Sequence, residues 1–128
     1  MRRRPGLGWV TAALIGFATG CGGGTSSPTP APTPTGTTIT ITNNTVSPST
    51  LTISRGQQVT FVNNDSREHE MNSDPHPEHT DCPELNQVGH LNAGQQRTSG
   101  NLNTARRCGF HDHLNDNIAS MKGSITIQ

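Results

Sequence analysis

The sequence predicts an all-β fold, a small β-sandwich over residues 38–128 that follows an export signal and a linker. Residues 37–42 (Thr-Thr-Ile-Thr-Ile-Thr) and 123–128 (Gly-Ser-Ile-Thr-Ile-Gln) both alternate with a period of two and are rich in β-branched residues. Three such short segments follow one another near the start of this region, and no segment has the pattern of an amphipathic helix. About ninety residues suffice for one small domain with a modest core, and therefore for one function.

The first twenty residues have the pattern of an export signal. A basic head of three arginines precedes an apolar run over residues 9–18, and small residues lead to Cys21. The apolar run is too short to span a bilayer with margin, because a transmembrane helix needs about 20 apolar residues. We therefore expect export from the cytoplasm.

Ala18-Thr-Gly-Cys21 resembles the lipobox of bacterial lipoproteins, in which the cysteine becomes the lipidated first residue. This resemblance implies a membrane-anchored lipoprotein, either periplasmic or at the cell surface. The alternative is an ordinary cleaved signal followed by an incidental cysteine. Residues 21–37 are rich in Pro, Thr and Gly and contain no large apolar side chain, so we interpret them as a linker that holds the domain away from the membrane.

The predicted strands follow in order. After the strand at 37–42, a turn over residues 43–49 leads to a second strand at 51–53 and a third at 58–63, with Val59 and Phe61 on one face. Residues 68–96 are polar and contain three prolines, so we expect a loop with at most one short strand. Residues 101–110 should be extended, and the last strand at 123–128 should pair beside an early one.

Composition excludes several functions. Without the three N-terminal arginines, six basic residues face nine acidic ones, a formal charge of −3, and no basic stripe suggests a nucleic-acid partner. Phe61 and Phe110 are the aromatic residues of the domain, too few for a stacking platform. The chain has no nucleophile elbow, phosphate loop or haem attachment motif, so we expect no enzyme activity.

The stretch from Cys108 to Met121 is the strongest functional signal. It places His111, Asp112, His113 and a thioether within fourteen residues, and these are groups that bind transition metals. A short loop alone would hold such a site poorly, so a ligand from further upstream is expected, and His69 is the natural candidate.

All six histidines lie between residues 69 and 113. His76 and His79 occur in Asp-Pro-His-Pro-Glu-His-Thr-Asp, where their spacing would allow two imidazoles on one ion, although a flexible acidic loop is the simpler interpretation. His90 is interpreted as a solvated loop residue.

Residues 38–128 resemble a cupredoxin, the plastocyanin-like copper domain. The resemblance rests on Val46-Ser-Pro-Ser-Thr-Leu-Thr-Ile, on Gly56-Gln-Gln-Val-Thr-Phe-Val-Asn-Asn-Asp leading to His69, on Leu91-Asn-Ala-Gly, and on the loop that ends at Met121 before Gly-Ser-Ile-Thr-Ile. It implies a Greek-key sandwich, copper as cofactor, electron transfer with a redox partner protein, His69 as the first copper ligand and Met121 as the axial one.

The chain departs from the family at the thiolate ligand, because Phe110-His111-Asp112 places aspartate where the family has cysteine. Imidazoles with a carboxylate form a harder site that favours a tetragonal cupric ion or zinc. In a regular strand, Asp112 shares a face with Cys108 and Phe110, and His111 lies on the other face with His113. A non-redox module for metal binding or delivery, or a structural domain with a vestigial site, are therefore alternatives to an electron carrier.

Cys82 and Cys108 are the two cysteines of the domain, and in an exported chain we expect them to form a disulfide. The rival interpretation is a Cys-x-x-His ligand pair made by Cys108 and His111, with Cys82 free.

Overall fold

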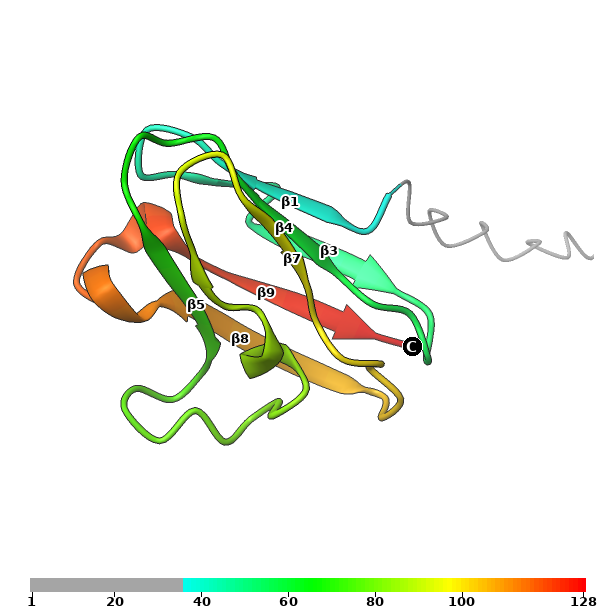
Figure 1. Cartoon of the computed structure of the whole chain (residues 1–128). Helices are drawn as coiled ribbons and strands as arrows, with labels where there is room; N and C mark the ends of the chain where they lie inside the picture. The colour runs from blue at the N-terminus through cyan, green and yellow to red at the C-terminus, as the bar shows by residue number, and fades with distance from the viewer. Residues whose placement is uncertain (1–35) are drawn as a thin grey trace, which may run out of the picture. The chain divides into compact units, whose positions relative to one another are not determined.

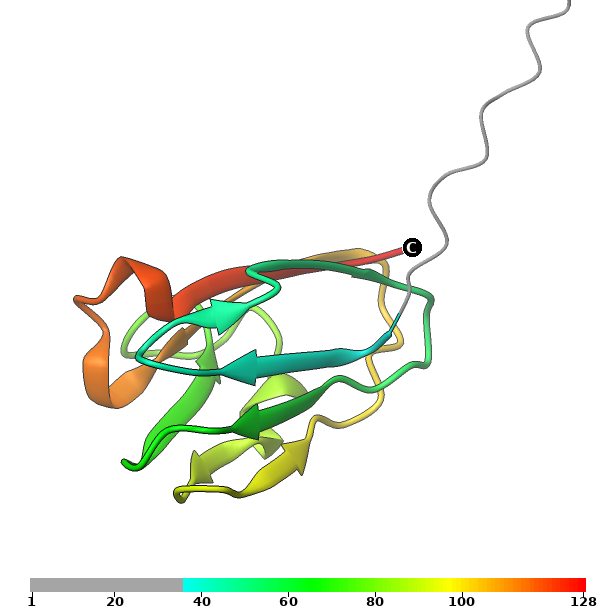
Figure 2. The same cartoon turned by 90° about the horizontal axis from the view of Figure 1, so that it is seen from above.

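The computed structural model describes residues 36–128, which form two β-sheets packed face to face (Figures 1 and 2). One sheet has the strand order β2-β1-β4-β7 and the other has the order β3-β9-β8-β5-β6. The elements are β1 (Thr38–Ile41), β2 (Val46–Ser47), β3 (Thr50–Ile53), β4 (Thr60–Asn63), β5 (His69–Ser73), the 3-10 turn η1 (Leu85–Gln87), β6 (Gly89–Leu91), β7 (Gln96–Thr98), β8 (Arg106–Asp112), the 3-10 turns η2 (His113–Asn115) and η3 (Ala119–Met121), and β9 (Lys122–Ile127).

The pairing joins distant parts of the chain. β1 runs parallel to β4, and β3 runs parallel to β9, while the other neighbouring strands are antiparallel. In Figure 1, β9 (red) lies between β8 and β3. The predicted sandwich is confirmed, as is the prediction that the last strand pairs beside an early one.

The core lies between the two sheets and is built from alternate residues of the strands. Phe61 of β4 and Phe110 of β8 meet edge to face, with ring centroids 5.3 Å apart. The buried apolar side chains are Ile39, Ile41, Val46, Ile53, Val59, Phe61, Met71, Cys82, Leu85, Val88, Leu91, Leu102, Cys108, Phe110, Met121, Ile125 and Ile127.

Residues 68–96 differ from the prediction of a loop with at most one strand. They contain β5, η1 and β6, and β7 begins at Gln96. The periodic signal is missing from β5 because four of its five residues are buried, among them the polar His69, Asn72 and Ser73. A strand covered on both faces does not alternate between polar and apolar residues.

A disulfide joins Cys82 to Cys108, with the two Cα atoms 5.8 Å apart, as expected from the sequence. The rival interpretation of Cys108 as a metal-binding thiolate is wrong, because its sulfur is bonded to Cys82. The bond ties the segment after β5 to β8, the strand that carries His111.

The predicted signal (residues 1–20), the lipidated Cys21 and most of the linker (residues 21–37) lie outside the described residues. From residue 36 onward, no helix has the length and hydrophobicity needed to cross a bilayer.

Candidate metal centre

Two groups of polar side chains lie on opposite faces of the end of β8. Successive residues of a strand point to opposite faces of its sheet, so Phe110 and Asp112 share the inner face and His111 points away from it. The pairing of β5 with β8 supports this assignment of faces, since Met71 of the core lies opposite Asp112 and Asn72 lies opposite His111.

His111 is held in one orientation by Asp74. Its side chain is 2% exposed, and its Nδ1 lies 2.7 Å from Oδ1 of Asp74. Gly109 makes this contact possible, because a Cβ at that position would lie 2.0 Å from Oδ2 of Asp74. Nε2 of His111 is buried and has no hydrogen-bond partner among the described residues. A carboxylate on one imidazole nitrogen, with the other nitrogen free, is the usual arrangement of a metal-binding histidine.

The segment after β5 folds back over this face and brings two further histidines. Its ends are joined by a hydrogen bond from the amide of Asp81 to the carbonyl of Asp74 (2.8 Å), and the amide of His79 donates to the carbonyl of Pro75 (2.7 Å). His79 adopts a φ of 53°, a left-handed conformation that is uncommon outside glycine, and the Asn86 side chain donates to its carbonyl. Such conformations cluster at functional sites.

Four imidazoles converge here: one nitrogen each of His76, His79, His111 and His113 lies within 4.8 Å of the others. His113 begins η2, directly after β8, and its Nδ1 is 3.1 Å from Nε2 of His79. Two nitrogen ligands about 2.0 Å from one ion lie between about 2.8 Å (right angle) and 3.3 Å (tetrahedral) apart. The observed separation is that of a hydrogen bond between the two rings, and it also falls in that range. We call these four residues the four-histidine cluster.

The four histidines of the cluster differ in their exposure to solvent. His111 is buried, His79 and His113 are half-buried, and His76 is exposed, with its Nε2 3.8 Å from an oxygen of Asp116. One side of the site is therefore anchored on β8, and the other is open to solvent.

Burial lowers the pKa of His79 below its ordinary value, and the neighbouring His111, His113 and His76 lower it further, against an opposing effect of Glu70. A lowered pKa keeps the imidazole neutral and its lone pair free for a metal ion.

This shift predicts a pH dependence of stability in the metal-free protein. As the pH falls below about 6.5, His79 becomes protonated in the unfolded chain before it does so in the folded protein. The unfolded state then binds more protons, so the free energy of unfolding decreases below that pH and is unaffected by His79 above it. Urea unfolding at pH 7.5 and 5.5 should show a smaller stability loss on acidification in His79→Gln than in the wild type. An equal or larger loss in the variant would contradict this assignment.

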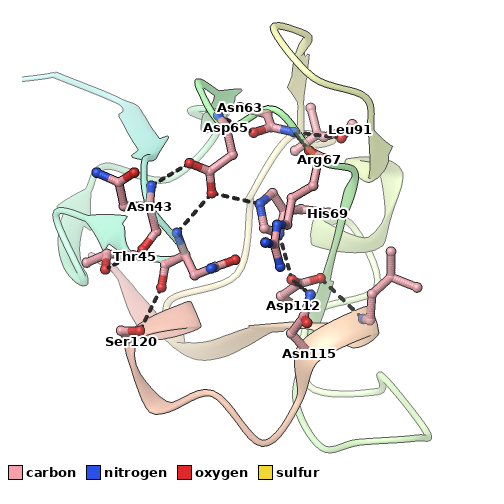
Figure 3. A network of polar contacts seen from close by, with 12 residues as sticks. Asn43, Thr45, Asn63, Asp65, Arg67, His69, Leu91, Asp112, Asn115 and Ser120 are labelled. Carbon is pink, nitrogen blue, oxygen red and sulfur yellow. Dashed lines mark hydrogen bonds and ion pairs between the residues drawn. The ribbon is translucent and has the colours of Figure 1, made fainter.

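The inner group is centred on His69, which is fully buried at the start of β5 (Figure 3). Its Nδ1 lies 2.8 Å from Oδ2 of Asp112, and its Nε2 lies 3.0 Å from Oδ2 of Asp65. Both ring nitrogens are thus engaged by carboxylates.

Each carboxylate is also held by other donors. Asp112 accepts from the amides of Glu70 (2.9 Å) and Leu114 (3.2 Å) and from Nδ2 of Asn115 (2.7 Å). These contacts link β5, β8 and η2.

Asp65 accepts from the backbone amides of Asn43 and Asn44. Burial acts to raise the pKa of Asp65, but the hydrogen bonds from Asn44, Asn43 and His69 outweigh it and leave that pKa lowered.

The structure divides the predicted ligands. His111 and His113 belong to the four-histidine cluster, whereas His69 and Asp112 bind each other, so the five predicted residues do not surround one point. Met121 is fully buried in the hydrophobic core.

The structure places His76 and His79, for which the sequence favoured a flexible acidic loop, in one cluster with His111. It also adds Asp74, which the sequence did not indicate. The signal for the two histidines was the spacing in Asp-Pro-His-Pro-Glu-His, together with a disulfide that returns this segment to β8. His90 is exposed on β6 and contacts Glu68.

No protein-family model matches the chain. It is 34% identical over 83 residues to a plastocyanin of Scenedesmus fuscus, an alignment that covers 63% of this chain and 84% of that protein. Similar solved structures include a purple cupredoxin from Nitrosopumilus maritimus (TM-score 0.56, 18% identity, covering 73% of this chain and 100% of that one).

The oxidised plastocyanin of Dryopteris crassirhizoma has a TM-score of 0.56 at 19% identity, over 71% of this chain and 99% of that one. An amicyanin variant in its reduced Cu(I) form has a TM-score of 0.55 at 16% identity, over 71% and 80%. The sandwich and the identity to plastocyanin agree, and the chain belongs to the plastocyanin-like cupredoxin family.

Proposed function

We propose that this protein binds one copper ion through His76, His79, His111 and His113 and functions as a copper-binding protein. The observation that carries the proposal is Nε2 of His111, a buried nitrogen without a hydrogen-bond partner among the described residues, next to three other imidazoles. Unpaired buried polar atoms are rare, and a metal ligand is one of the explanations for them. We propose copper because the chain is similar to a plastocyanin and to an amicyanin variant whose structure was solved in its Cu(I) form.

The donor set determines what copper chemistry to expect. Imidazoles suit a cupric ion, whereas soft thiolate ligands favour the cuprous state and give blue copper sites their intense colour. Cys108 is bonded to Cys82 and offers no thiolate. Binding of a cupric ion without redox cycling is therefore the function that this geometry supports best.

Electron transfer with a redox partner protein is the second candidate, and family membership favours it. Four imidazoles without a thiolate are a poor match for rapid cycling between the two copper states. Imidazole nitrogens also bind zinc, so the identity of the bound metal has to be determined by experiment.

Titration with Cu(II) should give one ion per chain, a pale protein and nitrogen splitting from imidazoles in the electron paramagnetic resonance spectrum. An intense visible band would favour electron transfer, and the absence of stoichiometric binding would refute the proposal. Metal analysis of the protein isolated from its native compartment distinguishes the metals: copper supports the proposal, and zinc contradicts it.

We also propose that the protein is exported and held at a membrane by a lipid on Cys21. The motif Ala18-Thr-Gly-Cys21 and the linker that follows it support this. Cys21→Ser should move the protein from the membrane fraction to the soluble fraction, because the lipid is its attachment. Ser26→Ala, which leaves the motif intact, should stay with the membrane. Membrane association that survives Cys21→Ser would contradict a lipid anchor.

A further inference from the structure

We propose that His76 is the replaceable member of the four-histidine cluster, and that its position accepts an uncharged nitrogen ligand from outside the chain. The class of ligand is the imidazole of a histidine carried by a partner protein. This inference rests on the proposed copper site, because His76 can be replaced as a ligand only where a metal is bound.

The three other histidines are fixed by contacts within the domain. His111 lies on β8, and its ring is held against Asp74 at 2.7 Å. Both the backbone amide and the backbone carbonyl of His79 are hydrogen-bonded within the domain. His113 begins η2 directly after β8, and its Nδ1 is 3.1 Å from Nε2 of His79. These three imidazoles therefore form a pocket that is in place before an ion binds.

His76 has no comparable attachment. In the described part of the chain, neither its backbone nor its ring makes a hydrogen bond, and the carboxylate of Asp116 lies 3.8 Å from its Nε2. Pro75 and Pro77 flank it and have no amide hydrogen to donate to a neighbouring segment. Its side chain is 38% exposed, compared with 2% for His111. Ordering such a residue costs conformational entropy, so we expect it to add least to the affinity and to leave most readily.

His76 also supplies the outer ring of the cluster. Its ring centroid lies 4.7 Å from that of His113 and 5.4 Å from that of His111. Because His111 is buried and His76 is exposed, the position that His76 takes is the one that faces solvent. Removal of this ring would leave three nitrogen ligands in place and one coordination position open to the solution.

The surroundings of this position favour an uncharged ligand. Residues 68–96 contain six acidic residues and no Lys or Arg, and Asp116 adds a carboxylate beside His76. Carboxylates repel an anionic donor such as a thiolate or azide. A neutral imidazole is not repelled, and it suits a cupric ion. A histidine on an exposed segment of a partner protein presents this group.

Chemical rescue tests the proposal on the full chain, with Cu(II) and free imidazole as probes. His76→Ala should bind one Cu(II) with one fewer nitrogen ligand in its paramagnetic spectrum and with affinity lowered by only about 10-fold. A ligand on a short flexible segment acts at an effective concentration on the order of millimolar, so imidazole at that concentration should restore the affinity and the spectrum of the wild type. Azide at the same concentration should not restore them.

His111→Ala is the matched comparison. It should lose at least about 100-fold in affinity and should not recover with imidazole, because the position that it vacates is closed to solvent. Thr80→Ala, which is exposed on the same segment and lies outside the cluster, should bind as the wild type does. Three results in His76→Ala would overturn the proposal: an unchanged spectrum, a loss of affinity as large as that of His111→Ala, or no recovery with imidazole.

Nitrogen-15 imidazole added in excess to the copper-loaded wild type makes the test independent of any variant. One labelled nitrogen should appear among the ligands in pulsed paramagnetic resonance while the ion stays bound. A bound ion without a labelled nitrogen would contradict the replacement of His76 and leave the proposed copper site intact. A wild-type protein that takes up no copper would instead refute the proposed function, and this inference would fail with it.

Discussion

His111→Ala is expected to lower the affinity for Cu(II) by at least about 100-fold, the largest effect of any single histidine replacement. His111 is the buried member of the four-histidine cluster, and it is fixed on a central strand by Asp74. Loss of contacts outside the ligand shell already costs about 10–100-fold, so removal of the best-held ligand should cost more. Competition titration against a chelator of known affinity measures the change.

His90→Ala is the matched control for that variant. His90 is exposed on β6, it contacts Glu68, and it does not belong to the cluster. Its replacement should leave the affinity within about twofold of the wild type. Equal losses in the two variants would indicate adventitious binding by surface histidines and would refute the site.

Removing the disulfide should have the largest effect on stability. The bond closes a loop with a sequence separation of 26, for which the chain-entropy model gives about 3.5 kcal/mol. Urea unfolding of the metal-free double variant Cys82→Ser/Cys108→Ser should show a decrease of that size in the free energy of unfolding. Copper affinity should also fall, because Cys82 ends the segment that carries His76 and His79.

The unreduced protein supplies the control for the disulfide prediction. Under denaturing conditions it should show no reactive thiol at Cys82 or Cys108, and a reducing dithiol should lower its stability toward that of the double variant. Two titratable thiols in the untreated protein, or a double variant as stable as the wild type, would contradict the assignment.

Most of the fold could be predicted from local pattern. The sequences of β1, β3 and β9 alternate between threonine and an aliphatic residue, and the isoleucines of all three strands are buried in the core. Val59 and Phe61 are also buried, as predicted. β5 could not be predicted in this way. Residues on both of its faces are buried, among them Asn72, which lies opposite His111, and Ser73, whose backbone amide donates to the Asn86 side chain.

The site could be predicted in part, for a similar reason. Strand alternation correctly separated Asp112 from His111, and the presence of two cysteines in an exported domain correctly indicated a disulfide. The grouping of His76 and His79 with His111 depends on the Cys82–Cys108 bond and on the close approach of Asp74 to Gly109. These contacts are made in the folded protein between segments about 30 residues apart, and local periodicity carries no information about them.

The location of the metal is the central claim, and anomalous X-ray scattering at the copper edge from crystals of the copper-loaded protein tests it most directly. We predict one strong peak within bonding distance of Nε2 of His111, surrounded by His76, His79 and His113, and no peak beside His69. A peak bonded to His69, next to Asp112 or Met121, would contradict the account and return the copper to the position that it has in the family.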